Sequence, residues 1–403
     1  METTVTHWTS NRRDVLRASG ATLFLALAGG KLRAADSAGR PLPEGDAYAP
    51  WTLWNDPSIR NTPLALVAAG VIAANPHDTQ PWLFAIGEDS IEIYADTSRN
   101  LGAMDACIRE MHLGLGCAIE NMLTAAGANG YVAQLEAAPG SLTDLTERSR
   151  PVLAARLRLS RIAGVVADPR YAAIPLRHTN RYAYDLAKAP PADWRDFTRA
   201  LGDEGEVKLF LFDAGSPQRR LFDAAVVEAT EAIIADAPMI ADSDRWFRDS
   251  AHEIDVHRDG PTLDAAGLST FTLIFAHLFS VSAETSHKAW LDQTRDVQLP
   301  TAPIAGLIAV RDRYDRPGAI AAGRAWQRLH LDATLRGMAL QPLNQPIEMI
   351  DRERQTGAGS VWAQRVAELT GEDWQATFSF RAGFSSTKAN ASPRRRLGDV
   401  VKT

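Results

Sequence analysis

The most constraining feature of this chain of 403 residues is an internal repeat. The segments GCAIENMLTAAGANG (116–130) and GRAWQRLHLDATLRG (323–337) align without gaps and share their first and last glycines and two alanines. An aspartate, Asp105 or Asp312, precedes each copy at the same distance. Such a repeat predicts two related halves that pack together. Two unrelated alanine-rich helices that end at glycine would match about as well.

The rest of the hydrophobic pattern predicts an α+β fold. Residues 60–74 have apolar side chains at helical spacing, and PWLFAI followed by SIEIYAD predicts a β-hairpin with GEDS at the turn. Residues 108–130 predict a buried helix that closes on glycine, and GEVKLFLFDA predicts a strand. The resulting fold is a sheet flanked by helices in each of two related halves, which form a pseudo-dimer within one chain.

A turn-rich, polar stretch divides the two predicted halves near residues 140–175. The first half then spans 50–145 and carries the Gln-Pro-Trp loop, and the second spans 150–403, with a lid-like insertion at about 242–300. The insertion contains an apolar segment, Ala265–Ala283, interrupted by His277. This segment is a poor membrane span and predicts a buried helix or a lid.

Composition excludes several classes of function. An apolar content of 45% with 23% charged residues is typical of globular proteins, and a net charge of -6 gives no reason to expect a nucleic-acid partner. Two cysteines, Cys107 and Cys117, allow no disulfide framework and no CxxC motif, and we expect both to be buried as small apolar residues. HEIDVH (252–257) lacks the histidine spacing of a zinc helix, so we expect no metal.

The N-terminal segment 1–35 resembles a twin-arginine export signal. Arg12 and Arg13 precede an apolar stretch, Ala18–Gly30, which is too short for a membrane span of ~20 residues. Small residues follow, although Arg33 interrupts the cleavage pattern. The resemblance implies passage through the twin-arginine machinery to the periplasm or cell envelope, and it favours a cofactor loaded before export. A frayed basic terminus is the alternative.

Two polar motifs carry the chemistry. IAANPHDTQPWLF presents Asn75, His77, Asp78 and Gln80 within six residues, although an ordinary Asn-Pro turn would also contain such residues. RHTNR (177–181) alternates cation, hydroxyl and cation. In an extended or tightly turned segment these alternate side chains project to one side, where they could hold a phosphate, unless the segment is a solvated strand.

Taken together, NPHDTQPW, RHTNR, RGMALQPLNQP and SPRRRLGDVV resemble the motifs of the FMN-dependent nitroreductase family, in their Acg-type branch of twofold length. The resemblance covers roughly residues 55–400 and implies a nitroreductase-like fold with FMN as the cofactor. It also implies one complete site per chain, because the first half has the Gln-Pro-Trp loop and the second has the phosphate segment. These parts come from different subunits in ordinary family members, and the resemblance makes chance repetition of the two helices less plausible.

The resemblance implies roles for particular residues. The FMN phosphate would be held by Arg177, Thr179 and Arg181 with Arg394 or Arg395. The isoalloxazine ring would meet the loop residues Asn75, Pro76, His77, Asp78 and Gln80, and its reactive nitrogen would lie near the backbone of Asn344 and Gln345. No residue is implied as a catalytic acid or base.

Asp78 departs from the family pattern, which commonly has asparagine at this position. An ionised carboxylate cannot donate to a flavin carbonyl. Asp78 would therefore either accept from the flavin ring N–H or serve only as a turn residue with Thr79, and the second interpretation is slightly favoured.

The implied function is an FMN-dependent oxidoreductase that accepts electrons from NAD(P)H or another donor and reduces a planar electron-poor acceptor, such as a nitroaromatic or a quinone. The alternative is a flavin-binding or flavin-sequestering protein with little turnover. A hydrolase has little support, because no nucleophile and base can be placed by motif.

Overall fold

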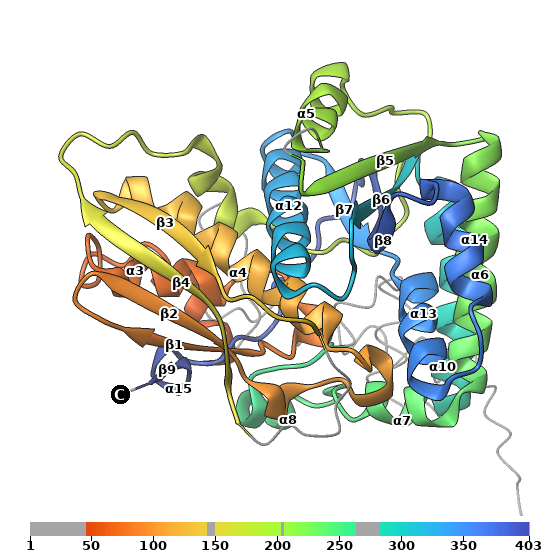
Figure 1. Ribbon diagram of the computed structural model, residues 1–403, viewed down its shortest axis with the longest axis horizontal. Helices are drawn as coiled ribbons and strands as arrows, with labels where there is room; N and C mark the ends of the chain where they lie inside the picture. Colours follow the sequence, from red (N-terminus) through yellow and green to blue (C-terminus); the bar gives the residue numbers. More distant parts are fainter. Residues whose placement is uncertain (1–45, 143–149, 203–204, 263–282, 403) are drawn as a thin grey trace, which may run out of the picture.

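The computed structural model describes residues 46–142, 150–202, 205–262 and 283–402. Two sheets and the helices around them make up this part of the chain, which confirms the α+β class (Figure 1). Two long helices, α4 (Arg109–Ala128) and α12 (Arg316–Leu335), lie between the sheets. The predicted export signal 1–35 and most of the apolar segment in the predicted insertion lie outside the described residues.

The first sheet contains the predicted hairpin. β1 and β2 pair antiparallel with Trp82 opposite Ala95, and alternate residues of β2 are buried. The spatial order of this sheet is β3 (Tyr131–Ala137), β4 (Val152–Arg161), β2 (Ser90–Ala95), β1 (Trp82–Ile86) and β9 (Val401–Lys402). Because β4 and β9 lie beyond residue 150, one sheet contains residues from both predicted halves.

The second sheet is covered by helices on both faces. Its spatial order is β5 (Val207–Asp213), β6 (Ile304–Val310), β8 (Gln375–Gly383) and β7 (Ala339–Pro342). Every residue of β6 is buried, and successive side chains enter different cores, Leu307 on one face and Ile308 on the other. Helix α12 covers the face of Ile308, whereas the opposite face packs on α6 (Pro217–Ala235), α13 (Gln345–Thr356) and α14 (Val361–Thr370).

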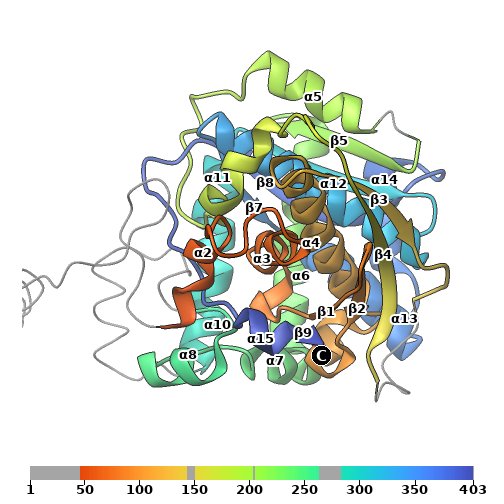
Figure 2. The same ribbon diagram turned by 90° about the vertical axis from the view of Figure 1, so that its left-hand side faces the viewer.

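Helices α4 and α12 contain the two copies of the repeat and cross at its matched glycines. Figure 2 shows the two helices side by side at the centre of the molecule. A Cβ atom on Gly116 would stand 2.3 Å from the carbonyl oxygen of Ile320, and one on Gly323 would stand 2.0 Å from that of Leu113. The glycines that close the repeats have left-handed φ values of 75° and 70°, where an L side chain is strained.

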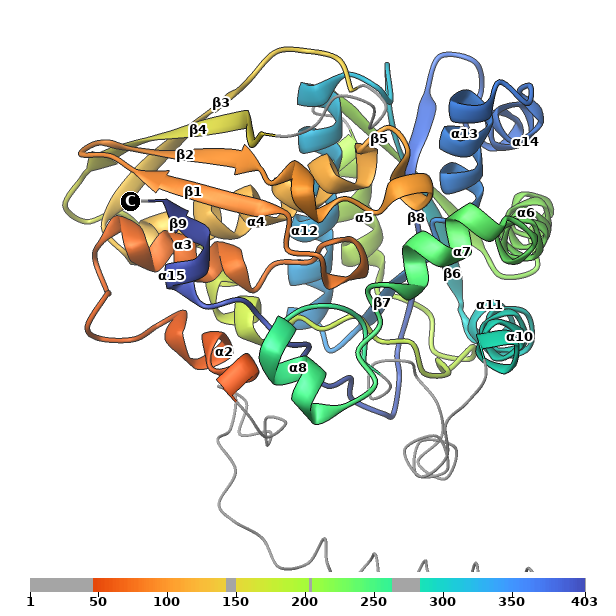
Figure 3. The same cartoon turned by 90° about the horizontal axis from the view of Figure 1, so that it is seen from below.

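The remaining described helices are α2 (Pro50–Leu53), α3 (Pro63–Val71), α5 (Ala192–Gly202), α7 (Ala237–Asp244), α8 (Ala251–His257), α10 (Ala283–Gln293), α11 (Leu299–Thr301) and α15 (Leu397–Val400). A π-helical turn, Thr294–Gln298, joins α10 to α11. Seen from below in Figure 3, α7 and α8 of the predicted insertion lie between α2 on one side and α6 and α10 on the other. Within the described ranges, no helix is both long enough and apolar enough to cross a membrane.

Candidate functional site

The predicted polar loop, residues 75–80, connects α3 to β1 in an uncommon backbone conformation. His77, Asp78 and Gln80 have φ values of 45°, 48° and 49°. This left-handed region costs a residue with a Cβ atom roughly 1–2 kcal/mol. The loop also approaches α4 closely at Gly114, where a Cβ atom would stand 3.0 Å from the proline of the loop. Backbone of this kind is concentrated at ligand-binding sites and needs support from its surroundings.

Gln80 supplies much of that support. Its side chain is fully buried, its Nε2 donates to the carbonyl of Arg258 at 2.8 Å, and its Oε1 accepts from the backbone N–H of Arg395 at 2.7 Å. Its backbone N–H donates to Asn75 Oδ1 at 2.7 Å. Both ends of the Gln80 amide therefore have protein partners, and the side chain ties the loop to two segments far along the chain. Its implied contact with a flavin ring stays a prediction.

Asp78 forms a buried ion pair with Arg394. Asp78 Oδ1 lies 2.5 Å from Arg394 Nη1, and the two side chains are 10% and 2% exposed. Arg394 Nη2 donates to the carbonyl of Ala73 at 3.2 Å, and the ring of Trp51 lies 4.9 Å from the centre of the guanidinium. Neither predicted role of Asp78 included this pairing, which directs the carboxylate to an arginine of the implied phosphate site.

Arg177 lies close to the same ion pair and has no carboxylate of its own. Its Nη2 donates to the carbonyl of Ile72 at 3.4 Å, whereas its Nε is buried and has no hydrogen-bond partner among the residues that the structure describes. Burial, and then the positive charge of Arg394, lower the pKa of Arg177 to about 10. The Nε of Arg394 is likewise buried without a partner. Arg177 and Arg394 are buried and repel each other, and both interact with the negative charge of Asp78. Such an environment favours the binding of an anion.

Arg181 completes what we call the arginine cluster, which is Arg177, Arg181 and Arg394. Burial lowers the pKa of Arg181, and Asp78 acts in the opposite direction. The pKa of His77 falls to about 4, first because it is buried and then because Arg181 is near, so His77 is neutral at pH 7. Thr179 is partly buried between the two arginines of its segment. The structure thus brings the segment 177–181 to the polar loop, as the resemblance implied.

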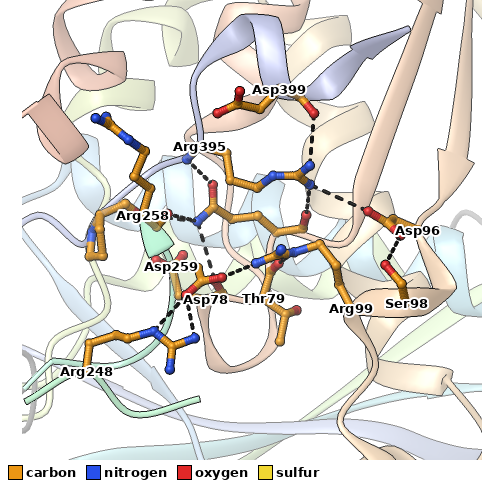
Figure 4. A network of polar contacts seen from close by, with 12 residues as sticks. Asp78, Thr79, Asp96, Ser98, Arg99, Arg248, Arg258, Asp259, Arg395 and Asp399 are labelled. Atoms are coloured by element: carbon orange, nitrogen blue, oxygen red, sulfur yellow. Dashed lines mark hydrogen bonds and ion pairs between the residues drawn. The ribbon is translucent and has the colours of Figure 1, made fainter. Parts of the chain in front are cut away.

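Arg394 and Arg395 point to different surroundings. Arg395 Nη1 donates to the carbonyl of Gln80 at 3.2 Å and lies 3.8 Å from Asp96, and Nη2 donates to the carbonyl of Asp399 at 2.9 Å (Figure 4). The sequence left open whether Arg394 or Arg395 belongs to the phosphate site. Arg394 is the one that interacts with Asp78, as Arg177 does.

Asn344 and Gln345 lie at the start of α13, beside the N-terminal part of α4. Asn344 Nδ2 donates to Glu110, and its Oδ1 accepts from the backbone N–H of Ser379 at 3.1 Å. Glu110 is one helical turn before Gly114, which touches the polar loop, so both contacts lie on one face of α4. Helix α4 therefore bridges the loop and the turn, whereas the Asn344 side chain itself bonds Glu110 and Ser379 rather than the arginine cluster or the loop.

A strap from the predicted lid-like insertion, residues 246–260, covers the polar loop, although the sequence did not show which residues it would contact. The backbone N–H of Gly260 donates to the carbonyl of Asp78 at 3.2 Å. The carboxylate of Asp259 pairs with Arg99 and, at 2.7 Å, with Arg248 (Figure 4). The sequence DG at 259–260 signals a turn, but no local pattern shows what that turn contacts.

The open depressions that the structure shows lie elsewhere. One of about 510 Å³ is formed by α6 and the segment 295–300, and none of the candidate residues lines it. Its charged lining residues, Asp223, Glu228 and Arg295, are far more exposed than Arg177 and Arg394. The cluster is the better candidate because its buried polar atoms lack partners, which a surface depression does not require.

Comparison with known proteins adds sequence similarity over most of the chain. Two sequences of Mycobacterium tuberculosis, from strains CDC 1551 / Oshkosh and ATCC 25618 / H37Rv, are provisionally named NAD(P)H nitroreductases. Each is 25% identical to this chain over 344 residues, which is 84% of this chain and 90% of the relative. No family model matches the chain.

Solved structures of nitroreductases are more distant. An FMN-bound nitroreductase from Desulfitobacterium hafniense DCB-2 is 10% identical, with a TM-score of 0.35 over 59% of this chain and 99% of that chain. A provisionally named nitroreductase from Anabaena variabilis ATCC 29413 is 12% identical, with a TM-score of 0.40 over 73% of this chain and 69% of that chain. These TM-scores are low, so the curated relatives carry the comparison. Over most of its length, the chain is similar in sequence to proteins named as NAD(P)H nitroreductases.

Proposed function

We propose that this chain is an FMN-dependent oxidoreductase of the nitroreductase type and that the arginine cluster holds the FMN phosphate. The observation that carries the proposal is the pair of buried guanidinium groups, Arg177 and Arg394, each with an unpartnered Nε beside the polar loop. The names of the curated relatives support the reaction class.

The residues present fit a phosphate group. A phosphate dianion offers several acceptor oxygens, and guanidinium groups bind such oxygens through charge-assisted hydrogen bonds. The two unpartnered Nε atoms are donors and need an acceptor. Burial and then the positive charge of Arg394 lower the pKa of Arg177. A dianion would also offset the repulsion between these two arginines.

The protein would contribute binding and shelter rather than an acid and a base. FMN, when bound, supplies the hydride or electron transfer itself. The arginine cluster would hold the phosphate, and the left-handed backbone of His77, Asp78 and Gln80 would set the wall against the ring. The strap and Trp51 would limit the access of water. We propose NAD(P)H as the donor and a planar electron-poor acceptor, a nitroaromatic or a quinone.

We also propose that the chain is an internal pseudo-dimer with one complete site. Two reciprocal contacts support the proposal: Gly116 meets Ile320, and Gly323 meets Leu113, which are matching positions in the aligned repeat. The polar loop comes from the first predicted half, whereas all three arginines come from residues after 150. Fusion of two subunits would place these parts in one chain.

Substitution of Arg177 tests the phosphate assignment. FMN and riboflavin differ by the phosphate, so the Arg177→Gln variant should lose affinity for FMN while its affinity for riboflavin changes little. A charge-assisted hydrogen bond is worth about 1.5–3 kcal/mol, which is roughly a tenfold to hundredfold loss. Flavin fluorescence during equilibrium titration measures both affinities.

Arg219→Gln is the matched control, because Arg219 on α6 is also buried but bonds Asp223 and the backbone carbonyls of Leu299 and Ala302. This variant should keep the ratio of FMN to riboflavin affinity. An unchanged ratio in Arg177→Gln, with the protein folded by circular dichroism, would reject the phosphate assignment.

Reduction of bound flavin separates an enzyme from a flavin-sequestering protein. The FMN complex, mixed anaerobically with NADPH or NADH in a stopped-flow instrument, should lose its oxidised flavin absorbance within the time of a turnover. A quinone should then restore the absorbance. A flavin that stays oxidised with both nucleotides would favour sequestration over catalysis.

A further inference from the structure

The carboxylate of Asp78 has two oxygens in different situations. Oδ1 accepts hydrogen bonds from Arg394 Nη1 at 2.5 Å and from Asn75 Nδ2 at 3.2 Å. Oδ2 is buried and has no hydrogen-bond partner. The residue is held in place by its backbone, whose carbonyl accepts from Gly260 N–H. One oxygen is therefore satisfied by the protein, and the other can take a proton or accept one hydrogen bond.

The charges around Asp78 come from several elements. They are Arg394 in the C-terminal segment, Arg177 and Arg181 in the phosphate segment, Arg99 after β2, Asp259 in the strap and the neutral His77 in the same loop. Burial raises the pKa of Asp78 to about 6, although Arg394, Asn75 and Arg99 act to lower it. The ion pair with Arg394 therefore does not fully offset the cost of burying this carboxylate.

A phosphate at the arginine cluster would bring a second anion to the same guanidinium. Two anions that share one buried site cannot both stay charged without a large cost, and the weaker acid of the two takes up a proton. We propose that binding of a phosphate group at the arginine cluster is coupled to the uptake of one proton by Asp78 at Oδ2. This inference rests on the proposed FMN site and names a residue that sets its affinity.

The proton comes from solvent, and no bond other than the new O–H is formed. Neutral Asp78 keeps Oδ1 on Arg394, and its Oδ2–H donates to an oxygen of the phosphate. Asp78 thus changes from a competing anion into a hydrogen-bond donor. Asparagine offers an acceptor and a donor in the same two positions without a proton, so Asp78→Asn should mimic the protonated residue.

A different role for Oδ2 would give opposite results. If Oδ2 accepted a hydrogen bond from the flavin ring N–H or from a ribityl hydroxyl, the carboxylate would stay charged and binding would take up no proton. Asp78→Asn would then replace an acceptor by a donor and weaken the binding of both FMN and riboflavin.

Isothermal titration calorimetry of the full chain with FMN tests the coupling. Titrations at pH 8 in two phosphate-free buffers with different ionisation enthalpies give the number of protons taken up. At this pH the phosphate of free FMN, with a second pKa of about 6, is already a dianion. A proton taken up on binding therefore goes either to Asp78 or to the bound phosphate, and the ³¹P NMR shift of bound FMN, expected at the dianion value, separates the two. We expect about one proton per FMN in the wild-type protein and none with riboflavin, which lacks the phosphate.

The Asp78→Asn variant should take up no proton and bind FMN more tightly. With a pKa of about 6 for Asp78, the wild-type affinity falls about tenfold for each pH unit above that value. At pH 8 the variant should therefore bind FMN on the order of 100-fold more tightly, and its advantage should disappear below pH 6. Asp96→Asn is the control, because Asp96 faces Arg395 instead of Arg394 and its loss should leave the proton uptake unchanged.

FMN binding without proton uptake, equal uptake with riboflavin, or weaker binding by Asp78→Asn would each overturn this inference while leaving the proposed function intact. Failure of both proteins to bind FMN would overturn the proposed function and the inference with it. If Asp78→Asn does not fold, the comparison of FMN with riboflavin in the wild-type protein, together with the ³¹P NMR shift of bound FMN, still decides the question: a monoanion shift would overturn the inference.

Discussion

At the scale of single residues, the candidate site depends on one buried carboxylate, Asp78, and on the arginines around it. Asn75, Asp78, Arg177 and Arg394 all lie at one place, as the motifs implied. The partner of Asp78 lies 316 residues away in the chain. No local pattern reveals such a pair, because the pair exists only after the C-terminal segment has packed on the loop. The left-handed backbone of the loop was equally hidden, since none of its residues is glycine.

A second group of buried carboxylates was missed altogether. Asp105, Glu110 and Asp351 surround the fully buried Arg109, and Glu348 lies beside Glu110. Burial raises the pKa of Glu110 to about 7 and that of Asp105 to about 6. Glu110 on α4 and Glu348 and Asp351 on α13 occupy buried helical positions, so only their polarity marked them. The repeat comparison drew attention to Asp105 alone, which precedes α4.

The Glu110→Gln variant should depend less on pH for its stability. The unfolded chain releases this proton near the ordinary pKa of 4.5 and the folded chain near 7, so the folded state binds more protons between these values. The stability of the wild-type protein therefore falls as pH rises through this window. Each unit of difference between the folded and unfolded pKa corresponds to about 1.4 kcal/mol in the free energy of unfolding. Urea midpoints at pH 5 and pH 8 should differ less in the variant, whereas Glu228→Gln, which removes an exposed ion pair with Arg365, should behave as wild type. Equal pH dependence in Glu110→Gln would contradict the assignment.

At the scale of elements, periodicity predicted the helices and the hairpin correctly. The predicted buried helix is α4, the predicted hairpin is β1 with β2, and the bare strand is β5. These elements are set by local apolar spacing and by glycine at turns. A lid-like insertion was predicted, but the contacts of the strap with the loop were not, because they are made by backbone groups and by charges that resemble ordinary surface residues. Both cysteines are buried, as expected.

The crossing of α4 and α12 depends on the absence of a side chain at the repeated glycines. A Gly323→Ala substitution would place Cβ 2.0 Å from a backbone oxygen of α4, which cannot move without the helix. Overpacking of this kind costs about 1–3 kcal/mol and occasionally more. Thermal unfolding should show a large loss of stability, and Gly116→Ala should act alike. Gly398→Ala, with no atom within 4 Å of the added Cβ, is the control and should be nearly neutral. A tolerated Gly323→Ala would argue against the close crossing.

At the scale of the whole molecule, the two repeated helices lie between two sheets. The candidate site contains residues from both predicted halves of the chain. The sequence repeat predicted the packing of the two helices α4 and α12 against each other. It did not foretell that β4 and the C-terminal β9 would join the first sheet, because strand pairing between distant segments has no signature in either strand alone. The C-terminal segment that ends in β9 also brings Arg394 to the polar loop.

We propose that the full-length chain is exported through the twin-arginine route. Replacement of Arg12 and Arg13 by lysine should stop export while leaving the folded protein able to bind FMN, because the change lies outside the parts that form the site. Cell fractionation with an antibody against the protein measures the distribution. The same distribution for the wild type and the double variant would contradict the proposal.

The central claim is that one chain forms one FMN site at the arginine cluster. Equilibrium titration of the folded full-length protein with FMN, followed by flavin fluorescence, tests it most directly. We predict saturable binding with one FMN per chain and affinity for FMN well above that for riboflavin. Two equivalents per chain, equal affinity for riboflavin, or no saturable binding would contradict the account.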